Sequence, residues 1–175
     1  MHYNFFCFIN DFDLNLINNL PKTTSIIYRN YNHPTNINKI IKIKNICKKK
    51  GFKFYLANEI KLALKLDLDG AYIPAFNKST KINSYTLKKK FKLLGSAHNL
   101  KEIRTKELQN VNYLFLSPLF TSKKSKKGLG IYKFINLSKK TKKKIICLGG
   151  INKDNINKIN LIKPYGIAAI SYFQN

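Results

Sequence analysis

Two apolar runs on either side of a lysine- and glycine-rich stretch decide the fold: VNYLFLSPLF at 111–120 and IICLGGI at 145–151. The apolar core of each run has the length of one strand and carries no charge, which is typical of a parallel strand buried on both faces. The residues between them, 121–144, suffice for a loop and a helix, the usual crossover between parallel strands. The runs break at Ser117-Pro118 and Gly149-Gly150, and α/β proteins place ligand sites at such carboxyl ends of strands.

The same alternation of strand and helix continues through the chain, with no linker or composition boundary. Helical spacing of apolar residues separates most of the strands, and the clearest helix is capped by Asn36 and stopped by Gly51. The pattern predicts an α/β fold: a compact single-domain (β/α)8 TIM barrel over residues 1–175, with a reduced C-terminal helix. An open doubly wound sheet is the alternative, although no GxGxxG follows the first strand. The predicted strands are 5–9, 25–28, 52–57, 71–74, 92–95, 113–116, 145–148 and 166–171; the predicted helices include 59–66, 99–107 and 154–162, and 78–90 is a looser segment.

The net charge of +25 raises the possibility of a nucleic-acid partner, but only Arg29 and Arg104 among the 33 basic residues are arginines. Sequence-reading proteins rely on arginine for bidentate contacts. The excess of Lys, Asn and Ile resembles the residue set of AT-rich codons. We therefore expect a solvated cationic surface and no specific nucleic-acid partner. No apolar stretch is long enough to span a bilayer, and the N-terminus has no basic leader, so we expect a cytoplasmic protein without a membrane partner.

The strand ends supply the candidate site, because in a barrel they converge on one mouth however far apart they lie in sequence. Glycine lets a backbone approach an anion, so Gly149-Gly150, followed by a helix from Asn152, is expected to bind phosphate. A plain tight turn is the alternative there, as a surface arginine is for Arg29 and a turn histidine for His98. The strand-end residues are Arg29-Asn30, Ala57-Asn58-Glu59, Asn77, Ser96-Ala97-His98, Ser117, Gly149-Gly150 and Ile170-Ser171.

Six segments in this order together resemble the thiamine phosphate synthase family, whose superfamily also contains the TenI-type thiazole tautomerases. The resemblance covers essentially the whole chain. It implies a compact barrel that handles a thiazole phosphate; the synthase joins it to hydroxymethylpyrimidine diphosphate and releases magnesium pyrophosphate. The segments are IIYRNY (26–31), ANEIKLALKLDLDGAYIP (57–74), GSAH (95–98), SPLFTSKKSKKGLG (117–130), LGGI (148–151) and GIAAIS (166–171).

The resemblance also implies roles for individual residues. Arg29 matches the arginine that binds pyrophosphate, and Ser96 and His98 match a serine–histidine pair at the pyrimidine or thiazole end; these three are the candidate catalytic residues. The resemblance assigns phosphate or pyrophosphate contacts to the loop lysines, to the glycine turn and to the last strand end. Those candidates are Asn58, Lys123, Lys124, Lys126, Lys127, Gly149, Gly150, Ile170 and Ser171.

The chain departs from the family at the metal. The family's two metal-binding aspartates fall on Asn58 and Asn77, and neutral amides are poorer Mg²⁺ ligands than carboxylates. Glu59 is expected to point the other way from Asn58, and Ile27 and Tyr31 replace a family glutamine and lysine. A synthase implies Mg²⁺, whereas a tautomerase, whose branch the KKGL string resembles, needs no cofactor. A synthase with a weakened metal site, a tautomerase and a non-catalytic phosphate-binding barrel therefore remain open, all with small phosphorylated thiazole or pyrimidine ligands.

Overall fold

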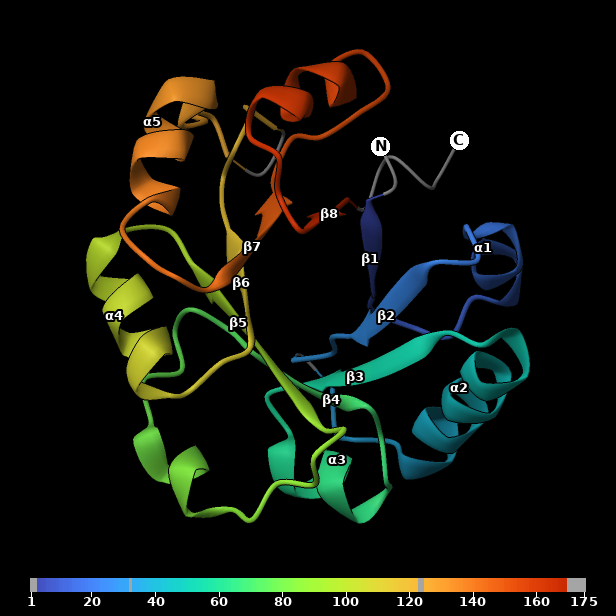
Figure 1. Cartoon of the computed structure of the whole chain (residues 1–175). Helices are drawn as coiled ribbons and strands as arrows, with labels where there is room; N and C mark the ends of the chain where they lie inside the picture. The colour runs from blue at the N-terminus through green and yellow to red at the C-terminus, as the bar shows by residue number, and fades with distance from the viewer. Residues whose placement is uncertain (1–2, 32, 123–124, 170–175) are drawn as a thin grey trace.

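The computed structural model describes residues 3–31, 33–122 and 125–169. Its strands pair in parallel in the order β1 to β8, and β8 closes the sheet onto β1. Figure 1 shows the strands in the middle with the helices arranged around them. The closed ring confirms the predicted barrel and excludes the open sheet. The strands are β1 (Asn4–Ile9), β2 (Thr24–Tyr28), β3 (Lys53–Ala57), β4 (Gly70–Ile73), β5 (Lys92–Ala97), β6 (Tyr113–Leu116), β7 (Lys144–Leu148) and β8 (Gly166–Ala168).

The described part of the chain contains five α-helices and two 3₁₀ helices between these strands. The caps of α2 follow its sequence: the Asn36 side chain accepts from the Lys39 N–H, and Gly51 ends the helix in the left-handed conformation. None of these helices is long and apolar enough to cross a membrane. The helices are α1 (Leu14–Asn19), α2 (Ile37–Lys50), α3 (Ile60–Lys65), η1 (Thr80–Ser84), α4 (Leu100–Leu108), α5 (Gly130–Ser138) and η2 (Ile156–Leu161).

Successive strand residues face opposite sides of the sheet, so the core has two layers. Aliphatic residues of the outer face pack under the helices, with Ile40 and Ile103 among the fully buried helix residues. The inner layer fills the barrel and is rich in aromatic rings, which suits a short barrel without a channel. Its buried members are Phe6, Phe8, Ile27, Tyr55, Ala57, Tyr72, Leu94, Phe115, Ile146 and Ala168.

Two sequence predictions were wrong in ways that matter for the site. The fifth strand extends to Ala97, so Ser96 lies inside β5 instead of after it. The helix predicted over 154–162, with a start near Asn152, is only the short 3₁₀ helix η2. The Asn152 side chain accepts from the N–H groups of Asp154 and Asn155, as a helix cap does. Beyond it, Ile156, Ile159 and Ile162 recur every three residues, which is the repeat of a 3₁₀ helix. The looser segment 78–90 contains η1.

Candidate active site

The floor of the mouth joins three strand ends through an aromatic ring. Arg29 follows β2 directly, and its guanidinium carbon lies 5.1 Å from the ring centroid of Phe8 on β1. Phe8 in turn meets Tyr72 on β4 edge to face, with centroids 5.2 Å apart. A cation held over an aromatic face is stabilised by the ring quadrupole. Arg29 is therefore held over the Phe8 ring, and because it is partly buried it is not a freely solvated surface side chain.

Ser96 is buried and shares this floor. Because Leu94 faces the barrel interior, the period of two along β5 turns Ser96 inward as well. Burial raises the pKa of Tyr72, while a hydrogen bond with Ser96 and the charge of Arg29 oppose that rise. Arg29 and Ser96, two of the predicted catalytic residues, thus both act on Tyr72, the first through its charge and the second through a hydrogen bond.

His98 is the first residue after β5, and its imidazole is held by α4. Glu102 Oε2 accepts from the His98 backbone N–H at 2.7 Å and lies 2.8 Å from Nδ1. A carboxylate only accepts, so Nδ1 carries a hydrogen in this contact and Nε2 remains to exchange a proton with a ligand. Partial burial raises the pKa of Glu102, but bonds from His98 and Asn99 outweigh this and bring the pKa below its usual value.

The two predicted metal positions contact each other. Asn77 Nδ2 donates to Asn58 Oδ1 at 2.7 Å, and Asn77 Oδ1 accepts from the Ser79 N–H at 2.9 Å. The Asn58 backbone has a φ of 63°, a left-handed conformation that asparagine tolerates, and its N–H donates to the Tyr72 carbonyl. The ends of β3 and β4 are therefore tied by an amide pair at the two positions where the sequence resemblance predicted metal ligands.

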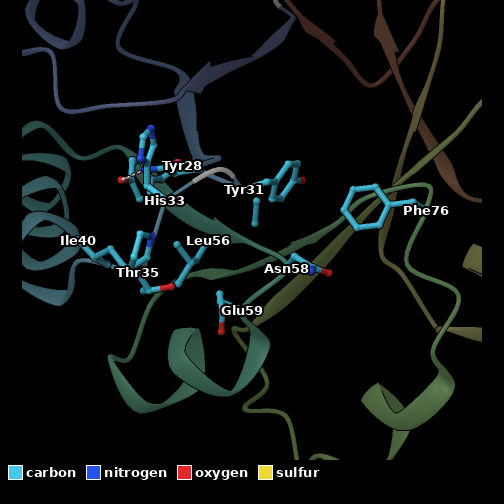
Figure 2. A pocket seen from close by; sticks show the side chains of 12 residues that line it. Tyr28, Tyr31, His33, Thr35, Ile40, Leu56, Asn58, Glu59 and Phe76 are labelled. Atoms are coloured by element: carbon cyan, nitrogen blue, oxygen red, sulfur yellow. Dashed lines mark hydrogen bonds between the residues drawn. The ribbon is translucent and has the colours of Figure 1, made fainter.

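A cavity of about 340 Å³ opens beside this amide pair, over the ends of β2 and β3. Two exposed rings stand at its rim: Tyr31 and Phe76 meet edge to face with centroids 5.4 Å apart. Figure 2 shows them facing one another, and shows the Glu59 side chain directed away from Asn58. The strand alternation from which this direction was expected does not reach Asn58, whose φ is 63°. The lining residues are Tyr28, Asn30, Tyr31, His33, Pro34, Thr35, Ile40, Leu56, Ala57, Asn58, Glu59 and Phe76.

The glycine turn after β7 packs against the loop after β6. The N–H groups of Leu119 and Phe120 donate to the carbonyls of Leu148 and Gly149, each at 2.9 Å. A Cβ on Gly150 would lie 2.5 Å from the Thr121 carbonyl oxygen, and Gly149 and Gly150 both have positive φ. Only glycine fits this approach of two backbones. The helix start expected beyond the turn is missing, so no helix dipole adds to the N–H groups of the turn.

The lysine loop begins and ends beside this turn. Its two ends are joined where the Leu129 and Gly130 N–H groups donate to the Pro118 and Leu119 carbonyls. Lys126 and Lys127 are exposed on it. Lys123, Lys124, Ile170 and Ser171, predicted to contact phosphate, lie outside the described residues.

Comparison with known proteins decides the family. The model of the family described as thiamine monophosphate synthase matches residues 16–173. The chain belongs to the thiamine monophosphate synthase family.

Curated thiamine-phosphate synthases are similar at about a third of positions. The protein of Prochlorococcus marinus is 32% identical over 157 residues, which cover 85% of this chain and 44% of that protein. One from Helicobacter pylori is 34% identical over 149 residues, covering 79% of this chain and 64% of the relative. The chain thus spans about half to two thirds of the length of these relatives.

Solved structures share the fold. A thiamine phosphate pyrophosphorylase from Pyrococcus furiosus superposes with a TM-score of 0.77 at 19% identity, covering 95% of this chain and 84% of that one. One from Bacteroides thetaiotaomicron gives 0.63 at 16% identity, covering 98% and 84%. At these identities the likeness supports the barrel and nothing finer.

The donor set of this family member does not fit a Mg²⁺ ion held by the protein. Mg²⁺ usually binds through one or two carboxylates, completed by water and substrate phosphates. Here Asn58 and Asn77 are neutral and bond each other, and Glu59 points away. No group of three His, Cys, Asp or Glu residues within the described ranges could hold a metal ion.

Several residues of the site were not predicted from the sequence. An aromatic ring in a strand is typical of core, so nothing distinguished Phe8 and Tyr72 from their neighbours. Glu102 could have been found, because it stands four residues after His98 and three after the helix cap Asn99. Phe76 gave a weaker signal, since a large ring beside Asn77 at a strand end is a feature of binding sites.

Proposed function

We propose that the chain catalyses the condensation of its family: it joins a thiazole phosphate to hydroxymethylpyrimidine diphosphate, and pyrophosphate leaves. The carbon–oxygen bond to the diphosphate breaks as the bond to the thiazole forms, so negative charge develops on the leaving pyrophosphate. Cations fixed where that charge develops lower the barrier. The fixed position of Arg29 over Phe8, beside Tyr72 and Ser96, is the observation that carries the proposal.

The remaining residues take supporting roles in this proposal. Lys126 and Lys127, on the loop next to Gly150, neutralise the far end of the diphosphate, together with Lys123 and Lys124. Gly149 and Gly150, with Ile170 and Ser171, receive the thiazole phosphate through backbone N–H groups. Ser96 orients the thiazole ring at the floor of the mouth. No step is assigned to Mg²⁺, because the residues at positions 58 and 77 do not fit it, and we expect condensation to be slow.

A second function, thiazole tautomerisation, is favoured by one observation: the contact between His98 Nδ1 and Glu102. Tautomerisation moves a proton between two ring positions and needs one group that donates and accepts it. With Nδ1 held by the carboxylate, Nε2 of His98 can take a proton and return it at another atom of the bound ring. This reaction uses neither Arg29 nor a metal.

One set of assays on the purified chain separates these proposals. Synthase activity predicts thiamine phosphate from both substrates, and Arg29→Met should abolish it while leaving the fold intact. Tautomerase activity predicts conversion of the thiazole phosphate alone, unaffected by Arg29→Met and lost in His98→Ala. A chain that a thiazole phosphate stabilises against heating, but that turns over neither substrate, would be a phosphate-binding barrel without catalysis.

A further inference from the structure

A buried lysine on α4 has no part in the proposed chemistry and still contacts the site. Lys106 lies one helical turn after the buried Ile103, so it faces the barrel, and none of its side chain is exposed. Its stem fits because residue 95 on β5 is a glycine: a Cβ there would lie 3.0 Å from Lys106 Cδ. Burying an ammonium group is costly unless its donors are satisfied.

All three hydrogens of the Lys106 ammonium have acceptors. Nζ donates to the Pro74 carbonyl at 2.8 Å, to the Asn77 carbonyl at 2.7 Å and to Gln109 Oε1 at 2.8 Å. Gln109, fully buried at the end of α4, donates from Nε2 to the carbonyls of Asn77 and Ser79 at 3.0 and 2.9 Å. Burial lowers the pKa of Lys106 to about 8, so the group is still charged at neutral pH.

These bonds all converge on one short turn, residues 74–79, which follows β4. The turn carries the Phe76 ring, which is 64% exposed and lines the cavity, and the Asn77 amide, which bonds the lining residue Asn58. Within the described residues, the aromatic contact of the Phe76 ring is the edge-to-face one with Tyr31. Exposed aromatic rings at the rim of a cavity are typical of contacts to a flat ligand.

We infer that Lys106 and Gln109 are positioning residues. They fix the 74–79 turn so that Phe76 and Tyr31 hold the pyrimidine ring of the diphosphate substrate over the cavity. The inference rests on the proposed function for the identity of that ring. It assigns ring recognition to this rim and leaves diphosphate recognition to Arg29 and the loop lysines. Ring affinity and pyrophosphate affinity should therefore respond to different residues.

The test compares two probes, hydroxymethylpyrimidine diphosphate and inorganic pyrophosphate, by calorimetry at pH 7 on the full chain. Lys106→Met keeps the stem and removes the donors, and Phe76→Ala removes the ring. Each change should lower the affinity for hydroxymethylpyrimidine diphosphate by about 10-fold or more, the scale of small misplacements in a site. Each should leave the affinity for inorganic pyrophosphate unchanged. The variant that combines Lys106→Met with Phe76→Ala should bind the diphosphate probe no more weakly than the weaker-binding single variant, because both changes act through the same turn. Lys101→Met, an exposed lysine of the same helix, is the matched control.

A loss that is equal for both probes, or effects that multiply in the double variant, would overturn ring positioning. Should Lys106→Met fail to fold, Gln109→Leu removes two of the bonds to the turn, and Phe76→Ala alters only an exposed side chain.

Hydrogen exchange of residues 75–79 without ligand tests, separately from the proposed function, whether Lys106 fixes the 74–79 turn. Faster exchange there in Lys106→Met than in Lys101→Met supports it, and equal exchange refutes it. If the unmodified chain binds neither probe, the proposed function and the ring contact fail together. Hydrogen exchange then still shows whether Lys106 fixes the 74–79 turn.

Discussion

Placing carboxylates at positions 58 and 77 should create a dependence on Mg²⁺ that we do not expect of the unmodified chain. Asn58→Asp with Asn77→Asp replaces an amide hydrogen bond of 2.7 Å by two like charges at similar separation. The lost bond costs about 1 kcal/mol. Two charges roughly 3 Å apart repel by about 1.4 kcal/mol even at the dielectric constant of water. Without metal the double variant should therefore lose about 2 kcal/mol, or roughly 4–8 °C in Tm for a chain of this size.

Mg²⁺ should recover that loss in the double variant, since a ligand of the native state stabilises it. The assay is thermal unfolding with Mg²⁺ and with EDTA, followed by the condensation rate, which we expect to rise in part. The matched control is Asn83→Asp with Asn110→Asp, another exposed amide pair, 3.2 Å apart and held between η1 and the end of α4. The condensation rate of that control variant should not rise with Mg²⁺. A double variant whose Tm and rate ignore Mg²⁺ would show that these positions are not a metal site in this chain.

Three further outcomes follow from the site and the surface. His98→Ala should remove thiazole tautomerisation, measured by exchange of the ring proton, while chelators leave the wild-type rate unchanged. The pKa of Glu102 is lowered in the fold, so the stability that Glu102 contributes is present above the unfolded pKa of about 4.3 and is lost as the pH falls through the folded pKa. The difference in unfolding free energy between wild type and Glu102→Gln should therefore shrink below about pH 4. A difference that stays constant with pH would contradict the contact with His98. DNA binding, measured by fluorescence anisotropy, should be independent of sequence and fall steeply with salt, whereas tight selective binding at physiological salt would contradict a purely compositional charge.

The barrel was predictable because its strands are short apolar runs that carry at most one charge, at their first residue, and are bounded by glycine, proline or asparagine. Such runs satisfy the requirement that a parallel strand be buried on both faces. The type of helix over 154–162 was predicted wrongly, because its apolar residues were read at the α-helical spacing. Ile156, Ile159 and Ile162 lie three residues apart, which over so short a segment fits the 3₁₀ repeat as well.

The candidate site was predictable only where it lies at strand ends. Arg29, Asn58 and His98 follow their strands directly and Asn77 lies in the turn after β4, so the barrel itself brings them to one mouth. Lys106 could not be found this way, because a lysine in a helix rich in charge is usually exposed. Its burial depends on Gly95, on the nearby Gln109 amide and on two carbonyls that only the folded turn brings to it.

The most direct test of the account is the condensation rate of the unmodified chain, measured with both substrates in the presence of Mg²⁺ and again with excess EDTA. The amide pair at Asn58 and Asn77, with Arg29 supplying the fixed charge, predicts slow formation of thiamine phosphate that EDTA does not alter. Fast turnover that EDTA abolishes would contradict this, because the ion would then be held without either carboxylate.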